Sequence, residues 1–150
     1  MVKLFKIFFH KIFKKRHICR ILPSNNYTID IRTNRNARIL VKIIMVDTNA
    51  ICSEDKIKKP YMNQIETTLQ ETRRNNISFV IVVGHDSILG FGFTQKNCLK
   101  ERLKPLLHHY NVKAYFGGSD QLFQHYTDTY LDSKVEYFTA GESTRLYYHL

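Results

Sequence analysis

The sequence predicts an α/β domain in which a layered sheet is flanked by helices, and three observations support that prediction. Apolar runs of strand length, such as residues 38–48 and 78–84, are separated by segments with helical periodicity. These strands are apolar throughout and do not alternate, as is typical of strands buried on both faces of a sheet. The composition is that of a globular chain, with 43% hydrophobic and 24% charged residues, and a length of 150 residues suits one domain.

The first expected elements form a hairpin. Residues 22–26 are rich in Pro, Ser and Asn and break the chain, after which residues 27–33 alternate as a strand. Residues 38–48 read as a longer apolar strand, and the segment 34–37 between the two suits a hairpin turn. A polar loop, 49–60, then leads into the rest of the domain.

Two amphipathic helices are expected, one over about 62–76 and one from about residue 99 to 109, with the buried strand 78–84 between them. The first has Glu early and Arg late, as the helix dipole favours. The apolar stripe of the first helix is Met62, Ile65 and Leu69, and that of the second is Leu99, Leu103, Leu106 and Leu107. Helices of this kind pack one stripe against a sheet.

The last expected elements are a strand at 112–116 and a closing antiparallel pair at 122–128 and 134–141. Ligands of such sheets bind just beyond the carboxyl ends of the strands. His85 and Asp86 follow one buried strand, and the segment Ser119, Asp120, Gln121 follows another. The sequence therefore predicts a site at this edge of the sheet.

The net charge of +10 is concentrated at the N-terminus. Residues 1–20 contain seven Lys or Arg and no acidic residue, and the rest of the chain has 16 basic and 13 acidic residues, a net of 16 − 13 = +3. Nucleic-acid binding is not expected, because it needs basic residues spread over the folded surface among stacking aromatics. Residues 1–21 form a basic amphipathic arm. Its charged residues break the apolar run too often for a signal peptide or a membrane span.

Three interpretations of the arm remain open. It can lie on an anionic membrane surface or bind a protein, it can pack against the chain's own sheet, or it can be a product of gene truncation. The domain proper is expected to span residues 22–150.

Several segments, taken in order, make up a longer pattern. They read LPSNNYTIDI, VKIIMVDTNAIC, FVIVVGHDSI and NCLKERLKPLLHHYNVKAYFGG, followed by SDQLFQHY. In this order, residues 22–140 resemble the tartrate-resistant purple acid phosphatases, which belong to the calcineurin-like metallophosphoesterases. The resemblance implies half of a layered β-sandwich and hydrolysis of phosphomonoesters at a dinuclear centre of iron with iron, zinc or manganese.

The ligand pattern of that family is incomplete here. His85 matches the family's Gly-His ligand, whereas Ser119 and Gln121 stand where the family has two histidines, with Asp120 between them. The ligands of the family's first half have no counterpart. One imidazole does not hold two metals, so we expect no cofactor and no catalytic residue, with His85 as a remnant beside Asp86 and Asp120.

The histidines of the sequence suggest two other interpretations. A weaker single-metal site would need His85, Asp86, Asp120 and His125 to converge. His108 and His109 close the second expected helix, where solvated residues that favour the helix dipole are the simpler interpretation.

The resemblance also implies a disulfide between Cys52 and Cys98, with Cys19 unpaired. Such a bridge closes a loop of about 47 residues and stabilises the fold by about 4 kcal/mol in the chain-entropy model. It indicates an oxidising compartment, and the family is secreted or lysosomal, yet no signal peptide is recognisable. The location of the protein therefore stays open.

Three functions follow as expectations. The first is a truncated and catalytically inactive pseudo-phosphatase, and the second is an acid phosphatase that is active only with a separate first half. The third is a non-catalytic module that binds a membrane or a protein through its arm. Half of a sandwich leaves an apolar sheet face of several hundred Å² uncovered, which the arm or a homo-oligomer can cover.

Overall fold

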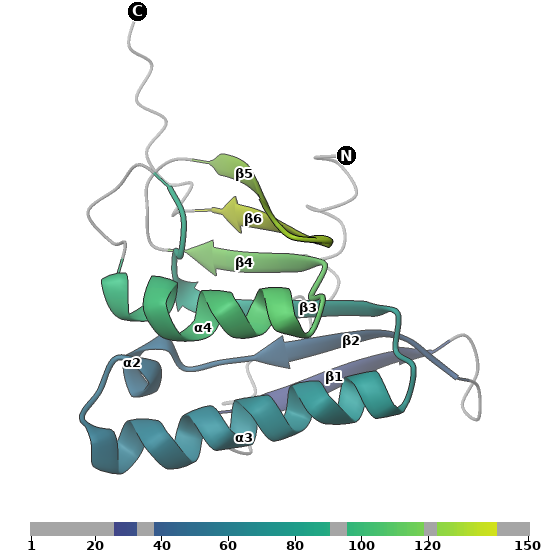
Figure 1. The fold of residues 1–150 in the computed structure, drawn as a ribbon, viewed down its shortest axis with the longest axis horizontal. Helices are drawn as coiled ribbons and strands as arrows, with labels where there is room; N and C mark the ends of the chain where they lie inside the picture. Colours follow the sequence, from purple (N-terminus) through teal and green to yellow (C-terminus); the bar gives the residue numbers. More distant parts are fainter. Residues whose placement is uncertain (1–25, 33–37, 91–95, 119–122, 141–150) are drawn as a thin grey trace, which may run out of the picture.

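The computed structural model describes residues 26–32, 38–90, 96–118 and 123–140, which form one six-stranded sheet with helices packed against it (Figure 1). The strands are β1 (Tyr27–Arg32), β2 (Ile39–Met45), β3 (Phe79–Asp86), β4 (Ala114–Gly118), β5 (Gln124–Tyr130) and β6 (Ser133–Thr139). The helices are α2 (Thr48–Ile51), α3 (Asp55–Arg74) and α4 (Asn97–His109).

The sheet is mixed, and its strand order is β1-β2-β3-β4-β6-β5. The pairs β2–β3, β3–β4 and β4–β6 are parallel, whereas β1 and β5 run antiparallel at the two edges. Parallel neighbours need a crossover, and α3 and α4 supply the crossovers on either side of β3. The predicted α/β class and both predicted antiparallel pairs are confirmed.

The described helices all lie on one face of the sheet, as Figure 1 shows. The core between them and the sheet includes side chains that are at most 1% exposed, among them Ile44, Ile65, Leu69, Val82, Leu99, Leu103, Leu107, Tyr115 and Tyr137. Burying each stabilises the fold by roughly 1.5–3 kcal/mol. The predicted stripes are confirmed, except that Met62 and Leu106 are half-buried at the border of this core.

Helix α3 begins at Asp55, about seven residues before the predicted start, and runs through Pro60. Proline normally ends or opens a helix, because it lacks an N–H and crowds the carbonyl one turn earlier. Here Pro60 lies on the exposed side, where water can hydrogen-bond the carbonyl that the missing N–H leaves free. The tertiary packing of Tyr61, Ile65 and Leu69 overrides the local signal.

The opposite face of β1, β2 and β3 is apolar. The strand register aligns its side chains in three rows: Tyr27–Met45–Val83, Ile29–Ile43–Ile81 and Ile31–Val41–Phe79. We call these nine residues the apolar far face. None is charged, Phe79 is 47% exposed, Ile43 is buried and the others are half-buried. No described helix covers this face, so within the described residues the sheet has helices on one side only.

The basic arm, residues 1–21, lies outside the described residues, and its role stays a prediction. Within the described ranges, no helix is both long and apolar enough to cross a membrane.

Candidate functional site

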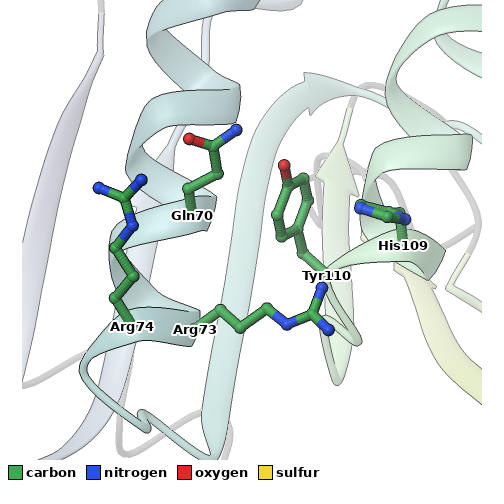
Figure 2. Close-up of a pocket in the computed structure, with 5 residues that line it drawn as sticks. All are labelled: Gln70, Arg73, Arg74, His109 and Tyr110. Atoms are coloured by element: carbon green, nitrogen blue, oxygen red, sulfur yellow. The ribbon is translucent and has the colours of Figure 1, made fainter.

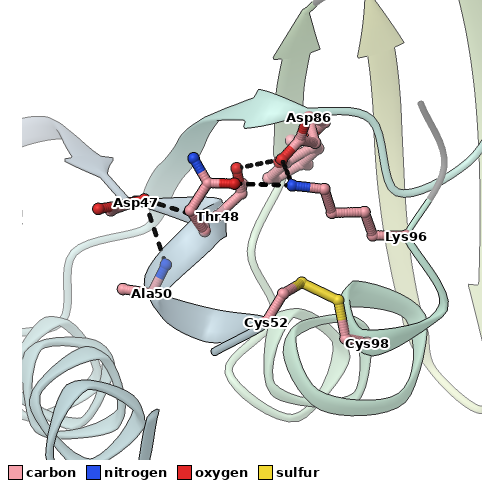
Figure 3. Close-up of polar contacts among 9 residues, drawn as sticks. Asp47, Thr48, Ala50, Cys52, Asp86, Lys96 and Cys98 are labelled. Carbon is pink, nitrogen blue, oxygen red and sulfur yellow. Dashed lines mark hydrogen bonds and ion pairs between the residues drawn. A yellow bond between two sulfur atoms is a disulfide. The ribbon is translucent and has the colours of Figure 1, made fainter. Parts of the chain in front are cut away.

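The edge where the sequence predicts a site carries a compact polar cluster around Asp86. Its side chain ends strand β3 and is only 7% exposed. One carboxylate oxygen, Oδ2, accepts a hydrogen bond from Thr48 Oγ1 at 2.5 Å and pairs with Lys96 Nζ at 2.8 Å (Figure 3). The Lys96 ammonium also donates to Asn49 Oδ1 at 2.8 Å. The cluster thus ties the start of α2, the end of β3 and the residue before α4 together.

The electrostatics of the cluster keep Asp86 ionised. Burial by itself raises the pKa of this carboxyl, because it disfavours the charged form. The hydrogen bonds from Lys96 and Thr48, together with the positive charge of Lys96, outweigh burial and hold the pKa of Asp86 below its usual range. The negative charge of the Asp86 carboxylate is therefore balanced by the positive charge of Lys96.

The short helix α2 is positioned by Asp47. Its Oδ1 accepts from the backbone N–H groups of Asn49 at 2.9 Å and Ala50 at 3.2 Å, which is the arrangement of an N-cap. The N–H of Asp47 donates to the Tyr61 hydroxyl oxygen at 2.5 Å, which fixes the cap against α3. Burial raises the pKa of Tyr61, so the hydroxyl stays protonated. The sequence prediction of a loop here overlooked the capping signal of Asp47.

Tyr115 supports the cluster from β4. Its hydroxyl donates to the backbone carbonyl of Asp86 at 2.6 Å. Burial raises the pKa of Tyr115 far above its usual value, so it acts as a hydrogen-bond donor. Gly84 makes room for this contact: a Cβ added there would lie 2.7 Å from Thr48 Cγ2 and closer still to the Tyr115 hydroxyl oxygen.

Gly84→Ala is expected to lower the free energy of unfolding by about 2 kcal/mol, since the new methyl group must displace two fully buried side chains. Urea unfolding followed by circular dichroism measures the change. Ser78→Ala, at an exposed position just before the same strand, is the control and should leave the midpoint unchanged. A Gly84→Ala protein as stable as the wild type would show that the site has more room than the contacts indicate.

The predicted disulfide is confirmed. Cys52 and Cys98 are bonded, with their Cα atoms 5.5 Å apart, which is the usual separation for such a bond. The bond joins the end of α2 to the first turn of α4, close to Lys96 (Figure 3). It therefore clamps the same two segments that Asp86 connects.

The structure does not bring His85, Asp86 and His125 together. His85 is exposed and, by the alternation of strand β3, points to the face opposite Asp86. His125 lies on β5, which is the third strand from β3 across the sheet, so the two strands are roughly 14 Å apart. There its ring stacks on Phe138 and its Nε2 lies 2.8 Å from Glu136 Oε2.

The donor groups at this edge do not fit a metal centre. Within the described ranges, no three His, Cys, Asp or Glu side chains lie close enough to hold one ion, and Asp86 is committed to Lys96. Ser119, Asp120 and Gln121 lie outside the described residues. The interpretation of His85 as a remnant therefore stays a prediction, as does the expectation that no cofactor binds.

His108 differs from its sequence interpretation as a solvated residue. It is buried, and its Nε2 lies 2.7 Å from Asp128 Oδ2 on β5, which also pairs with Lys104 Nζ at 2.9 Å. Burial raises the pKa of Asp128, but hydrogen bonds from Lys104 and His108 outweigh it and hold the pKa below its usual range. Asp128 is brought beside α4 only by the fold, so the sequence of the helix does not indicate that His108 is buried and paired. His109 is exposed, as expected.

Among comparisons with known proteins, only the comparison with solved structures gives matches. No family model matches the chain, and no curated protein matches it. A similar solved structure is described as "GAP50 the anchor in the inner membrane complex of Plasmodium", with a TM-score of 0.58 and 24% sequence identity. The match covers 77% of this chain and 36% of that one, so this chain spans about a third of the similar structure.

These findings correct the family drawn from the sequence motifs. The resemblance to purple acid phosphatases, and the acid phosphatase or pseudo-phosphatase function attached to it, find no support in family models or curated proteins, and the similar structure is described as an anchor. At this level of identity the likeness shows the fold alone: the chain shares the fold of part of a longer protein.

Proposed function

We propose that this chain is a non-catalytic protein-binding module and that its binding surface is the apolar far face. The observation that carries the proposal is the grid of nine uncharged side chains on β1, β2 and β3, on the face where no described helix lies. A largely parallel sheet is ordinarily covered on both faces, because its strands are apolar on both. A partner layer would complete this arrangement.

The fold comparison supports the same proposal. In the similar structure, described as an anchor, the matched part makes up 36% of the chain, so the shared sheet belongs to a body nearly three times as long. The apolar far face is the surface on which a further layer would add to this sheet.

The occupant to which we commit is a second copy of this chain. Two uncharged sheet faces pack directly on each other at about 10 Å. Outside the first 20 residues the net charge is only +3, so the domains of two copies repel each other little. The isolated protein is therefore expected to form a homodimer through the apolar far face.

Ile81→Lys tests this surface. Ile81 is the β3 residue in the central row of the grid, and in the dimer a lysine there would be buried without a partner. Analytical ultracentrifugation of the full chain over a concentration series should show a wild-type dimer and a dissociation constant raised at least roughly a hundredfold in the variant. Ile57→Lys is the matched control, because Ile57 is 59% exposed on α3, and it should dimerise like the wild type.

Phe79→Lys keeps the test valid if Ile81→Lys unfolds, because Phe79 is 47% exposed and tolerates a charge in the monomer.

A wild type that stays monomeric and binds no hydrophobic dye would mean that the face is closed within one chain, against the proposal. Flotation with anionic vesicles that Ile81→Lys abolishes would instead identify a membrane as the occupant. Turnover of a phosphomonoester that depends on Asp86 would contradict the non-catalytic assignment.

A further inference from the structure

A hollow of about 360 Å³ lies between the C-terminal ends of α3 and α4, on the helical side of the molecule. Its walls are formed by Gln70, Arg73, Arg74, His109 and Tyr110. Figure 2 shows Arg73 extended from the last turn of α3 towards Tyr110, with His109 beyond the tyrosine. Gln70 lies one turn before the two arginines, at the spacings that share a helix face. The hollow is separate from the Asp86 cluster and from the apolar far face.

The polar groups of the hollow are free to bind a ligand. Within the part of the chain that the structure describes, the side chains of Gln70, Arg73, Arg74 and His109 have no hydrogen bond or ion pair. Tyr110 is different: its hydroxyl donates to Glu66 Oε1 at 3.2 Å, and its ring meets His109 edge-on with centroids 4.7 Å apart. Tyr110 is therefore a fixed wall, and the arginines, Gln70 and His109 supply the donors.

Three guanidinium groups lie near the C-terminal end of α3. Arg73 and Arg74 are joined by Arg38, which donates to the carbonyl of Asn76 just beyond α3. Against these three positive charges stand Glu66, Glu71 and the two helix C-termini, each of which carries about half a negative charge. The helix dipoles explain why arginine suits the end of α3, but they do not explain free guanidinium groups around a hollow.

We infer that this hollow is a binding site for a phosphate-type oxyanion, such as the phosphomonoester group of a small molecule or of a lipid headgroup. A guanidinium group presents paired N–H donors that match two oxygens of such a group. The volume leaves room for the phosphate and part of the group to which it is attached. The inference does not depend on the proposed dimer, because Ile81→Lys leaves the hollow intact.

The first test is a titration of the full ¹⁵N-labelled chain with inorganic phosphate, followed by NMR and compared with sodium chloride at matched ionic strength. Amide shifts at residues 70–76 and 109–111 should saturate with phosphate and stay small with chloride. Arg73→Ala should weaken phosphate binding about tenfold. Arg73→Lys, which keeps the charge but loses the paired donors, should bind with intermediate strength.

Lys56→Ala is the matched control, since it removes an exposed cation from the opposite end of the same helix. It should bind phosphate like the wild type. An equal response to chloride, or an equal loss in Lys56→Ala and Arg73→Ala, would mean that the protein merely responds to ionic strength and would overturn the site. The amide spectrum of each variant also shows whether it is folded.

Vesicles distinguish the two sources of the phosphate group. The probe is co-sedimentation with phosphatidic acid vesicles, compared with phosphatidylcholine vesicles. If Arg73→Ala loses vesicle binding as well as phosphate binding, the site takes a lipid headgroup. If Arg73→Ala loses phosphate binding alone, the site takes a soluble phosphate ester. Saturable phosphate binding that survives both Arg73→Ala and Arg74→Ala would place the anion elsewhere and refute the inference.

Discussion

Cys52→Ser/Cys98→Ser is expected to lower the free energy of unfolding by about 4 kcal/mol. The bond links residues 46 positions apart, and removing it restores conformational freedom to the unfolded chain. It also releases α2 from α4, the two segments that hold Thr48 and Lys96 against Asp86. Urea unfolding of the oxidised wild type and of the double variant measures the difference.

Reduction of the wild type should reproduce the loss. Cys19→Ser is the control for removal of a thiol alone and should be as stable as the wild type. Equal stability of the oxidised and reduced wild type would show that other contacts hold α2 and α4 together and that the bond adds nothing.

Lys96→Met is expected to cost about 2–3 kcal/mol at neutral pH. The substitution keeps most of the side-chain volume but leaves the carboxylate of Asp86, which is 7% exposed, with Thr48 as its remaining side-chain donor. The Lys96 side chain is itself 35% exposed, so the loss is at the low end for a buried pair. Chemical unfolding at several pH values measures it.

The pH dependence of this loss follows from Asp86. Its pKa in the folded protein is below the ordinary 3.8, so its stabilisation is fully present above that value and is lost as the pH falls through the lower folded pKa. In Lys96→Met the effect of burial is less opposed and the pKa rises. The deficit of the variant should therefore shrink below about pH 4, where the carboxyl becomes protonated.

Lys56→Met, at an exposed position on α3, serves as the control and should show no measurable change at any pH. A deficit in Lys96→Met that is the same at acid and neutral pH would mean that lost packing, and not an unpaired carboxylate, destabilises the variant. The pH series thus distinguishes the electrostatic contribution of Lys96 from its contribution to packing.

The apolar patterns of the sequence were sufficient for the architecture. Residues spaced by three and four predict the buried stripes of α3 and α4, because only that spacing brings side chains onto one helix face. Continuous apolar strands predict the parallel centre of the sheet. The start of α3 was misplaced, because Pro60 is a local signal that the packing of Tyr61 and Ile65 overrides.

The sequence singled out Asp86 but not the residues that surround it. The chain alone places polar residues after β3, at the edge where α/β sheets bind ligands. It does not show that Lys96 and Thr48 reach Asp86, since these residues lie 10 and 38 positions away along the chain. His108 and Asp128 form a similar case across 20 residues.

The sequence by itself determined the fold class and the order of the main elements, since both depend on local periodicity. The bond between Cys52 and Cys98 was only implied by a family resemblance, and the structure established it. Only the tertiary structure decided what the polar and apolar surfaces do. A carboxylate acts as a ligand or as half of a buried ion pair according to which cation the fold brings to it. An apolar strand face is core or interface according to which side the helices take, and this is set by the crossovers, not by the strand sequences.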